Sequence, residues 1–130
     1  SHSIPLFAGT AKREDRVWLG GYGMSGPLGT LSLPGTFASG FNRISEIQGH
    51  RASIVFDPPG ENSETEEVFP SLMDSGSPVF LFRDSQWILS GITITVSNRN
   101  HPNYGDRSRH ERLASSREWL DQHIPQLSWV

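Results

Sequence analysis

The sequence predicts a mostly β fold with one helix near its carboxyl end. The 130 residues include 13 glycines and 9 prolines. They are spread along the chain and separate short runs of strand-forming side chains. A segment near the end has helical spacing and a helix start signal instead. We therefore expect an all-β domain that ends in an α-helix.

Two of the expected strands lie in the first half of the chain. Residues 16–22, RVWLGGY, begin as a strand and enter a glycine-rich turn. Residues 51–56, RASIVF, place Ala52, Ile54 and Phe56 on one face, which is the period of a half-buried strand. Each run is expected to cover one side of a core.

A hairpin is predicted in the second half. Residues 78–82, PVFLF, form a continuous apolar run, and residues 83–86, RDSQ, can turn the chain. Residues 87–96, WILSGITITV, return with many β-branched side chains, which favour a paired strand. We expect this hairpin at the centre of the core, and a polar, partly basic loop at 98–112 that leads back towards a strand.

The helix is predicted from residue 115 onward. Ser115 can cap it, and Glu118 three residues later completes a capping box. The residues expected to share one face are Trp119, Leu120, His123 and Ile124, and Pro125 ends the helix.

Composition excludes several classes of protein. With 35% hydrophobic and 19% charged residues, the chain fits one globular domain. The formal net charge of -3 gives no basic field for nucleic acid or an anionic membrane, so neither partner is expected. The chain contains no Cys, which excludes metal–thiolate sites and disulfides. No apolar run approaches the roughly 18 residues of a membrane helix, so a soluble segment is expected, with any signal peptide upstream or removed.

A glycine pattern mimics a dinucleotide fingerprint. Gly21, Gly23 and Gly26 have the required spacing, and Glu46 follows 20 residues after Gly26. The motif needs a helix directly after the glycines, but Pro27 and further turn residues follow. We expect these glycines to serve turns and close backbone packing.

No metal site or special charged site is expected. The histidines lack the i, i+4 pairing with a carboxylate that a zinc helix supplies. His101 and His110 are expected in a loop, and His123 on the polar edge of the helix. The acidic group and the basic group are both expected to be solvated loops rather than a calcium site or a nucleic-acid site: Glu61, Glu64, Glu66 and Glu67, and Arg99, Arg107, Arg109 and Arg112.

Asp74-Ser75-Gly76 is the strongest candidate for chemistry. A serine nucleophile must be exposed, must lose its proton to a base, and needs backbone N–H groups where the oxyanion forms. Glycine permits the sharp turn that exposes the hydroxyl. By itself such a tripeptide is a common turn, so its flanking segments decide the interpretation.

Together, these segments resemble the C-terminal half of a trypsin-like (chymotrypsin-fold) serine protease, especially its cysteine-free bacterial members. VWLGGYGMSG, 17–26, resembles the strand and Gly-aromatic-Gly turn that open the second barrel of that family. DSGSPVFLF, 74–82, is similar to the nucleophile motif DSGGP and its following strand. WILSGITI, 87–94, resembles the return strand at the substrate cleft, and residues 109–124 resemble the last strand and terminal helix.

The resemblance implies a fold and a domain organisation. The fold is a six-stranded antiparallel Greek-key barrel with a C-terminal helix, the second half of a double-barrel protease. Residues 1–15 are then an interdomain-linker-like segment, residues 16–114 the barrel, and residues 115–130 the helix and tail.

The resemblance also implies a serine endopeptidase. Ser75 would attack a peptide carbonyl, the N–H groups of Met73 and Ser75 would stabilise the oxyanion, and Asp74 would order the loop. The family carries its catalytic His and Asp on a first barrel, so an N-terminal barrel is the expected partner, in the same precursor or as a second chain. A protein or peptide substrate, no cofactor, no metal and a secreted or periplasmic location are expected.

Several residues depart from the family pattern or bear on specificity. Met73 stands where the family usually has glycine, and Ser77 replaces a second common glycine. Phe69 falls near the pocket floor, where cleavage after Lys or Arg would need a carboxylate, so cleavage after basic residues is not expected. Residues Ile94 to Val96 are expected along the cleft wall and Ser108 on its far side, which favours a small or apolar preference.

Two alternatives remain open. In the first, the side chain of Met73 has closed the oxyanion site, and the domain is a catalytically inactive protease-like protein that binds or scaffolds. In the second, the chain is an unrelated small β-sandwich binding module, and residues 73–78 form an ordinary surface turn.

Overall fold

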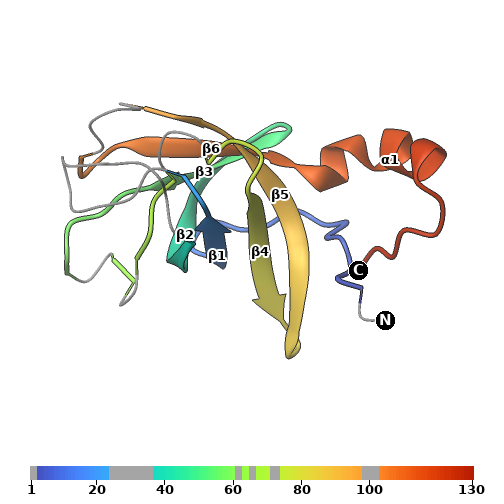
Figure 1. Cartoon of the computed structure of the whole chain (residues 1–130), viewed down its shortest axis with the longest axis horizontal. Helices are drawn as coiled ribbons and strands as arrows, with labels where there is room; N and C mark the ends of the chain where they lie inside the picture. The colour runs from blue at the N-terminus through green and yellow to red at the C-terminus, as the bar shows by residue number, and fades with distance from the viewer. Residues whose placement is uncertain (1–2, 24–36, 61–62, 65–66, 71–73, 98–102) are drawn as a thin grey trace.

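The computed structural model describes residues 3–23, 37–60, 63–64, 67–70, 74–97 and 103–130. Their strands are β1 (Arg16–Gly21), β2 (Ala38–Gln48), β3 (Arg51–Val55), β4 (Pro78–Arg83), β5 (Gln86–Val96) and β6 (Arg107–Arg112). A 3₁₀ turn, η1 (Leu113–Ser116), leads into the helix α1 (Arg117–His123). In Figure 1 the strands wrap around one another and α1 extends from one side of them.

The strands form a closed antiparallel barrel in the order β1-β2-β3-β6-β5-β4. β1, β2 and β3 follow one another around the barrel, and β4 then returns beside β1. This neighbour order, 4-1-2-3, is a Greek key. The six-stranded barrel predicted from the sequence is confirmed, and its closure replaces the two-sheet sandwich of the second alternative.

Alternation along the strands builds the core. Val17 and Leu19 of β1, and Val79 and Leu81 of β4, are each at most 5% exposed. Their neighbours in sequence point outward, as a period of two requires. The remaining members of this apolar cluster are Phe7, Ala11, Ile44, Ala52, Ile54 and Ile88.

The predicted strands at 16–22, 51–56, 78–82 and 87–96 all form, and the last two make the predicted hairpin. Phe56 lies just beyond the end of β3. The strand β2 was not anticipated. One reason is that a buried position on it is polar: Asn42 is 1% exposed, and its side-chain amide donates to the carbonyl oxygens of Val55 and Val68 at 3.2 and 3.0 Å.

The two ends of the chain join the sheet beside β5, beyond the end of β6. The N–H of Phe7 donates to the carbonyl of Leu89, and the N–H of Leu89 donates to the carbonyl of Pro5, both at 2.9 Å. On its other side, Leu6 exchanges backbone hydrogen bonds with Ser128 and Val130. The segment around Leu6 therefore pairs with β5 where β6 has ended.

The helix begins later than predicted and buries nothing. Ser115 lies in η1, and α1 is preceded by Ser116, whose side chain makes no capping hydrogen bond. The expected capping box is therefore wrong. Trp119 is 58% exposed and stacks on His123 at a ring distance of 4.3 Å. No helix in the described residues is long and apolar enough to cross a membrane.

His110 is a buried strand residue rather than the predicted loop residue. It lies on β6 with 2% exposure, opposite Ala52 of β3 and Thr93 of β5. Gly91 gives it room, because a Cβ there would lie 2.5 Å from the Cδ2 atom of His110. Within the described part of the chain, Nε2 of His110 has no hydrogen-bond partner. Burial, with a smaller contribution from Arg112, lowers the pKa of His110 from 6.5 to about 4.

This burial predicts loss of stability in acid. The pKa of His110 is lower in the folded than in the unfolded state, so the unfolded chain takes up the proton first. Through this group, the free energy of unfolding keeps its full value above pH 6.5. It falls by about 3 kcal/mol in all as the pH is lowered towards about 4. Urea unfolding of wild type and His110→Leu between pH 7 and pH 4 measures it. The difference between the two curves should change over this range, and parallel curves would contradict the prediction.

Candidate functional site

The site residues predicted from the sequence gather at one end of the barrel. Because neighbouring strands are antiparallel, the ends of β1, β3 and β5 meet the starts of β2, β4 and β6 there. Ser75 precedes β4, and Ile94 and Val96 end β5. Ser108 is near the start of β6 and pairs with Val96. Met73 lies outside the described residues.

Ser75 occupies an exposed, tightly bonded turn. The N–H of Ser77 donates to the carbonyl of Asp74 at 2.9 Å, and the N–H of Gly76 donates to the carbonyl of Thr93 at 2.8 Å. The N–H of Thr93 in turn donates to the carbonyl of Ser77 at 2.9 Å. Gly76 has φ +89°, a conformation that favours glycine. The turn is thus tied to β5 at Gly76 and Ser77, and Ser75 is exposed.

Asp74 sits in a cradle formed by the glycines that follow β1. Its Oδ1 atom accepts the N–H of Gly23 at 2.9 Å. A Cβ on Gly23 would lie 2.5 Å from Cγ of Asp74, and one on Gly21 would lie 2.8 Å from Oγ of Ser77. The structure therefore confirms close packing as a role of Gly21 and Gly23. Their missing side chains make the room into which the carboxylate fits.

The Ser75 hydroxyl has no basic partner among the described residues. Its Oγ atom donates to the carbonyl of Ile94 at 3.3 Å. His110 is buried, Nδ1 of His50 lies 2.7 Å from a carboxylate oxygen of Glu111, and Nδ1 of His123 lies 2.8 Å from the carbonyl of Trp119. The N–H of Ser75 also has no acceptor in this part of the chain. Among the described residues, the Ser75 hydroxyl therefore donates only to Ile94, and the Ser75 amide has no acceptor.

The predicted substrate-contact residues have different environments. Phe69 is partly buried and stacks on Phe56 at 5.4 Å, with the rings 15° apart. Ile94 and Val96 are partly exposed. Ser108 is 2% exposed, so its hydroxyl lies within the barrel wall and not on the surface.

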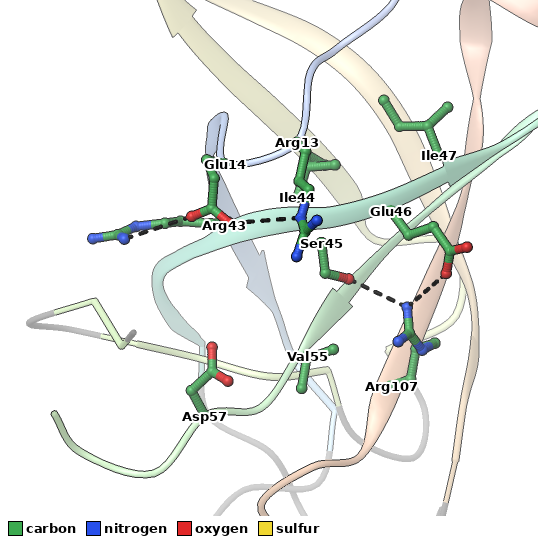
Figure 2. Close-up of a pocket in the computed structure, with 10 residues that line it drawn as sticks. All are labelled: Arg13, Glu14, Arg43, Ile44, Ser45, Glu46, Ile47, Val55, Asp57 and Arg107. Carbon is green, nitrogen blue, oxygen red and sulfur yellow. Dashed lines mark hydrogen bonds and ion pairs between the residues drawn. The ribbon is translucent and has the colours of Figure 1, made fainter. Parts of the chain in front are cut away.

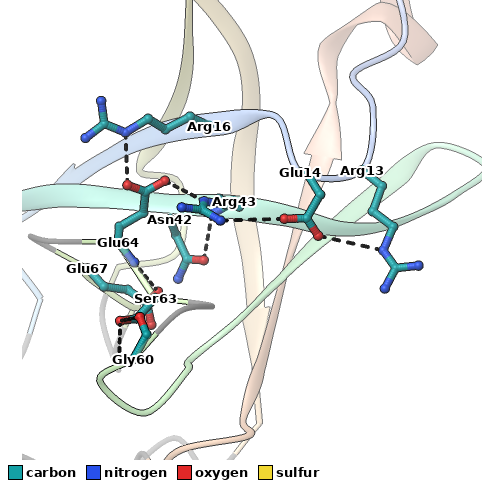
Figure 3. A network of polar contacts seen from close by, with 9 residues as sticks. All are labelled: Arg13, Glu14, Arg16, Asn42, Arg43, Gly60, Ser63, Glu64 and Glu67. Atoms are coloured by element: carbon teal, nitrogen blue, oxygen red, sulfur yellow. Dashed lines mark hydrogen bonds and ion pairs between the residues drawn. The ribbon is translucent and has the colours of Figure 1, made fainter.

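A polar network on β1 and β2 corrects the expectation of a solvated acidic loop for Glu64, while Glu61 and Glu66 lie outside the described residues. The side chain of Glu64 is 10% exposed and lies between two guanidinium groups, 3.2 Å from Arg16 and 2.8 Å from Arg43. The same arrangement is visible in Figure 3. The hydrogen bond from Arg43 to Glu64 raises the pKa of Arg43. Glu64 thus anchors its loop on the barrel, a long-range pairing that local charge pattern does not reveal.

The basic group is corrected as well, because Arg107, Arg109 and Arg112 lie on strand β6. Arg112 donates to the carbonyl of Gly49 at 2.6 Å and to the hydroxyl of Thr10 at 2.9 Å. Arg99 lies outside the described residues.

A groove of about 680 Å³ runs over β2 and the end of β3. Figure 2 shows its lining side chains, with Arg107 turned towards Ser45 and Glu46. Its arginines are paired within the protein: Arg107 with Glu46 at 3.3 Å, and Arg43 and Arg13 with Glu14 at 3.8 and 3.9 Å. The groove was not predicted. Because its positive and negative side chains pair with one another, they favour no particular class of ligand.

Comparisons with known proteins do not assign a family. No protein-family model matches the chain, and no curated protein matches it significantly. Within the described residues, no cluster of His, Cys, Asp or Glu side chains is arranged to hold a metal ion.

The Asp74 cradle predicts strong coupling between two substitutions. Gly23→Ala should destabilise the protein by about 1–3 kcal/mol, because its Cβ displaces the Asp74 carboxylate. In an Asp74→Ala background the same change should cost much less, since the obstructing carboxylate is gone. Urea unfolding of the double-mutant cycle measures this coupling. Additive effects of the two substitutions would show that the cradle does not hold the carboxylate.

Proposed function

We propose that this chain is the nucleophile-bearing half of a trypsin-like serine endopeptidase, with Ser75 as its nucleophile. The observation that carries the proposal is the exposed Ser75 turn, fixed between the Asp74 cradle and strand β5. A nucleophile needs an exposed hydroxyl on a backbone that does not move during the reaction. The exposure of Ser75 and the hydrogen bonds that hold its turn on β5 support this role.

The reaction divides into roles for named atoms. Oγ of Ser75 attacks the peptide carbonyl, and its proton passes to a histidine base. The N–H of Ser75, which has no acceptor among the described residues, would stabilise the oxyanion, and the resemblance assigns the same role to the N–H of Met73. Collapse of the tetrahedral intermediate releases the amine, which takes the proton from the histidine, and water then hydrolyses the acyl-enzyme.

No base for Ser75 is found among the described residues. In the described part of the chain, Ser75 donates to an amide carbonyl, which cannot accept its proton permanently. We infer that an N-terminal barrel, in the same precursor or as a second chain, supplies His and Asp. Residues 1–130 by themselves should therefore have negligible peptidase activity.

The second candidate is an inactive, protease-like binding domain. It is favoured by Met73, since a side chain at this position resists the backbone angle that glycine adopts freely, at a cost of about 1–3 kcal/mol. In that case the oxyanion site does not form, although the barrel and the turn remain.

Active-site labelling tests the enzyme proposal. The complete protein, containing residues 1–130 and the His-bearing half, is treated with a fluorophosphonate probe and digested for mass spectrometry. We expect a covalent adduct on Ser75, because only an activated serine attacks the probe quickly. Ser75→Ala should remove the adduct, while the control Ser39→Ala, at an exposed serine of β2, should keep it.

The same experiment separates the two candidates. A folded complete protein that leaves Ser75 unlabelled would reject the peptidase and support the binding domain. Peptidase turnover by residues 1–130 alone, lost in Ser75→Ala, would reject the requirement for a second half.

A further inference from the structure

The buried imidazole of His110 lies behind the Ser75 turn, separated from it by strand β5. His110 of β6 pairs with Thr93 of β5, and each residue is at most 3% exposed. Opposite residues of an antiparallel pair lie on the same face of the sheet, so the two side chains are neighbours inside the barrel. Thr93 is also a residue to which the turn is bonded. A single residue therefore links the imidazole to the turn that carries Ser75.

Three hydrogen bonds join the turn to Thr93 and Ile94 of β5. The N–H of Gly76 donates to the carbonyl of Thr93 at 2.8 Å, and the N–H of Thr93 donates to the carbonyl of Ser77 at 2.9 Å. Oγ of Ser75 donates to the carbonyl of Ile94 at 3.3 Å. The pairing of β5 with β6 shifts at Ile94, which is the extra residue of a bulge. Because bulges redirect the backbone, the position of β5 here decides where the turn lies.

The strands around His110 present no negative charge to it. β3 places Ala52 opposite the imidazole, and β5 places Gly91 and Thr93 beside it. On the far side of the barrel, Asn42 of β2 is polar but uncharged. The other buried side chains of β1, β2 and β4 are apolar: Val17, Leu19, Ile44, Val79 and Leu81.

The charged groups along β6 do not compensate a proton on His110 either. Arg109 and Glu111 lie on either side of it in sequence and point to the outer face of the strand. Arg112 adds a positive charge that lowers the pKa of His110 further, and its guanidinium is held by a backbone carbonyl and a threonine hydroxyl. Asp106, a buried acid ahead of β6, accepts a backbone N–H at 2.7 Å. A protonated His110 is therefore stabilised only when water reaches it, which requires a neighbouring strand to move.

Of the two strands beside β6, β5 is the weaker at this level. β3 pairs with β6 without a register shift from Arg51 to Val55. The pairing of β5 with β6 is interrupted by the bulge directly after Thr93, and the extra residue of a bulge is left out of the ladder. Water should therefore reach His110 by displacement of β5 at Thr93.

We propose that His110 is a positioning residue for the Ser75 turn, and that uptake of a proton by its imidazole opens β5 at Thr93 and releases the turn. In the neutral state the imidazole fills the space behind Thr93, and the three hydrogen bonds to the turn are kept. The release itself does not require Ser75 to be a nucleophile. Its consequence, that acid increases the fraction of molecules with a displaced nucleophile, rests on the proposed function.

Amide hydrogen exchange of the chain, followed by NMR at pH 7 and pH 5, tests the release. The amides of Gly76 and Thr93 make the two backbone bonds of the turn to β5, so both are freed when it opens. We expect their protection factors to fall about twenty-fold between these pH values. The reason is that the closed form binds the proton with a pKa of about 4, whereas the open form binds it with the ordinary pKa of 6.5.

Urea distinguishes this local opening from unfolding of the whole barrel. A local opening exposes little surface, so exchange of both amides at pH 5 should not change with urea well below the unfolding midpoint. Protection that is the same at pH 7 and pH 5 would overturn the inference. Protection that falls with urea as steeply as the global stability would also overturn it, because the proton would then act only through unfolding.

Two histidine variants assign the proton. His110→Gln keeps a polar side chain that does not titrate, so the protection of the Gly76 amide should become the same at both pH values. His123→Gln, the matched control at an exposed histidine of α1, should keep the twenty-fold fall. A fall that persists in folded His110→Gln would assign the proton to another group and reject the inference. If that variant does not fold, the exchange of wild type in urea still decides whether the turn opens locally.

Fluorophosphonate labelling of the complete protein at pH 7 reports separately on the proposed function. A labelled Ser75 in a protein whose turn does not open in acid rejects only this inference. A turn that opens in acid while Ser75 stays unlabelled at pH 7 rejects only the peptidase.

Discussion

The pairing of β1 with β4 is the constraint on which the rest of the structure depends. It joins Val17 to Leu81 and Leu19 to Val79 in register, and thereby closes the barrel. A closed sheet leaves β1–β6 without an open edge and satisfies the backbone of the strands internally. The same pairing sets the start of β4 beside the end of β1. The turn before β4 and the glycines after β1 come together only because the barrel closes there.

Strands in which apolar and polar residues alternate regularly could be predicted from the sequence, whereas β2 could not. The apolar and β-branched residues on either side of a short turn predict the β4–β5 hairpin. In β2, by contrast, Asn42 takes a buried position, and the register shifts between Ile44 and Glu46. A polar residue and a bulge both break the period of two that identifies a strand. Asn42 is tolerated there because Val55 and Val68 accept its amide hydrogens.

The candidate site also has features that the sequence predicts and features that it does not. Asp-Ser-Gly indicates an exposed turn from local chemistry alone, and the structure has that turn. The cradle around Asp74 depends on Gly23, 51 positions away, so the glycine motif could be assigned to close packing without its partner being known. Glu64 was expected to be solvated and His110 to lie in a loop, because their partners on β1, β2 and β5 are also distant in sequence. Local composition reports the polarity of a residue, whereas burial is decided by which strands become neighbours.

On β5 and its neighbouring strands, several interior positions are polar and several exterior positions are apolar. The interior positions of β5 and β6 include Thr93, Ser108 and His110, each at most 3% exposed, while the exposed rings of Phe82 and Trp87 lie outside on β4 and β5. Hydrophobic burial alone would favour the reverse arrangement. The Ser75 turn at the end of the barrel is held by Asp74 and by β5. Barrel closure therefore orders this turn whatever the polarity of the faces around it, because the hydrogen bonds that hold the turn come from β5 and from the glycines that follow β1.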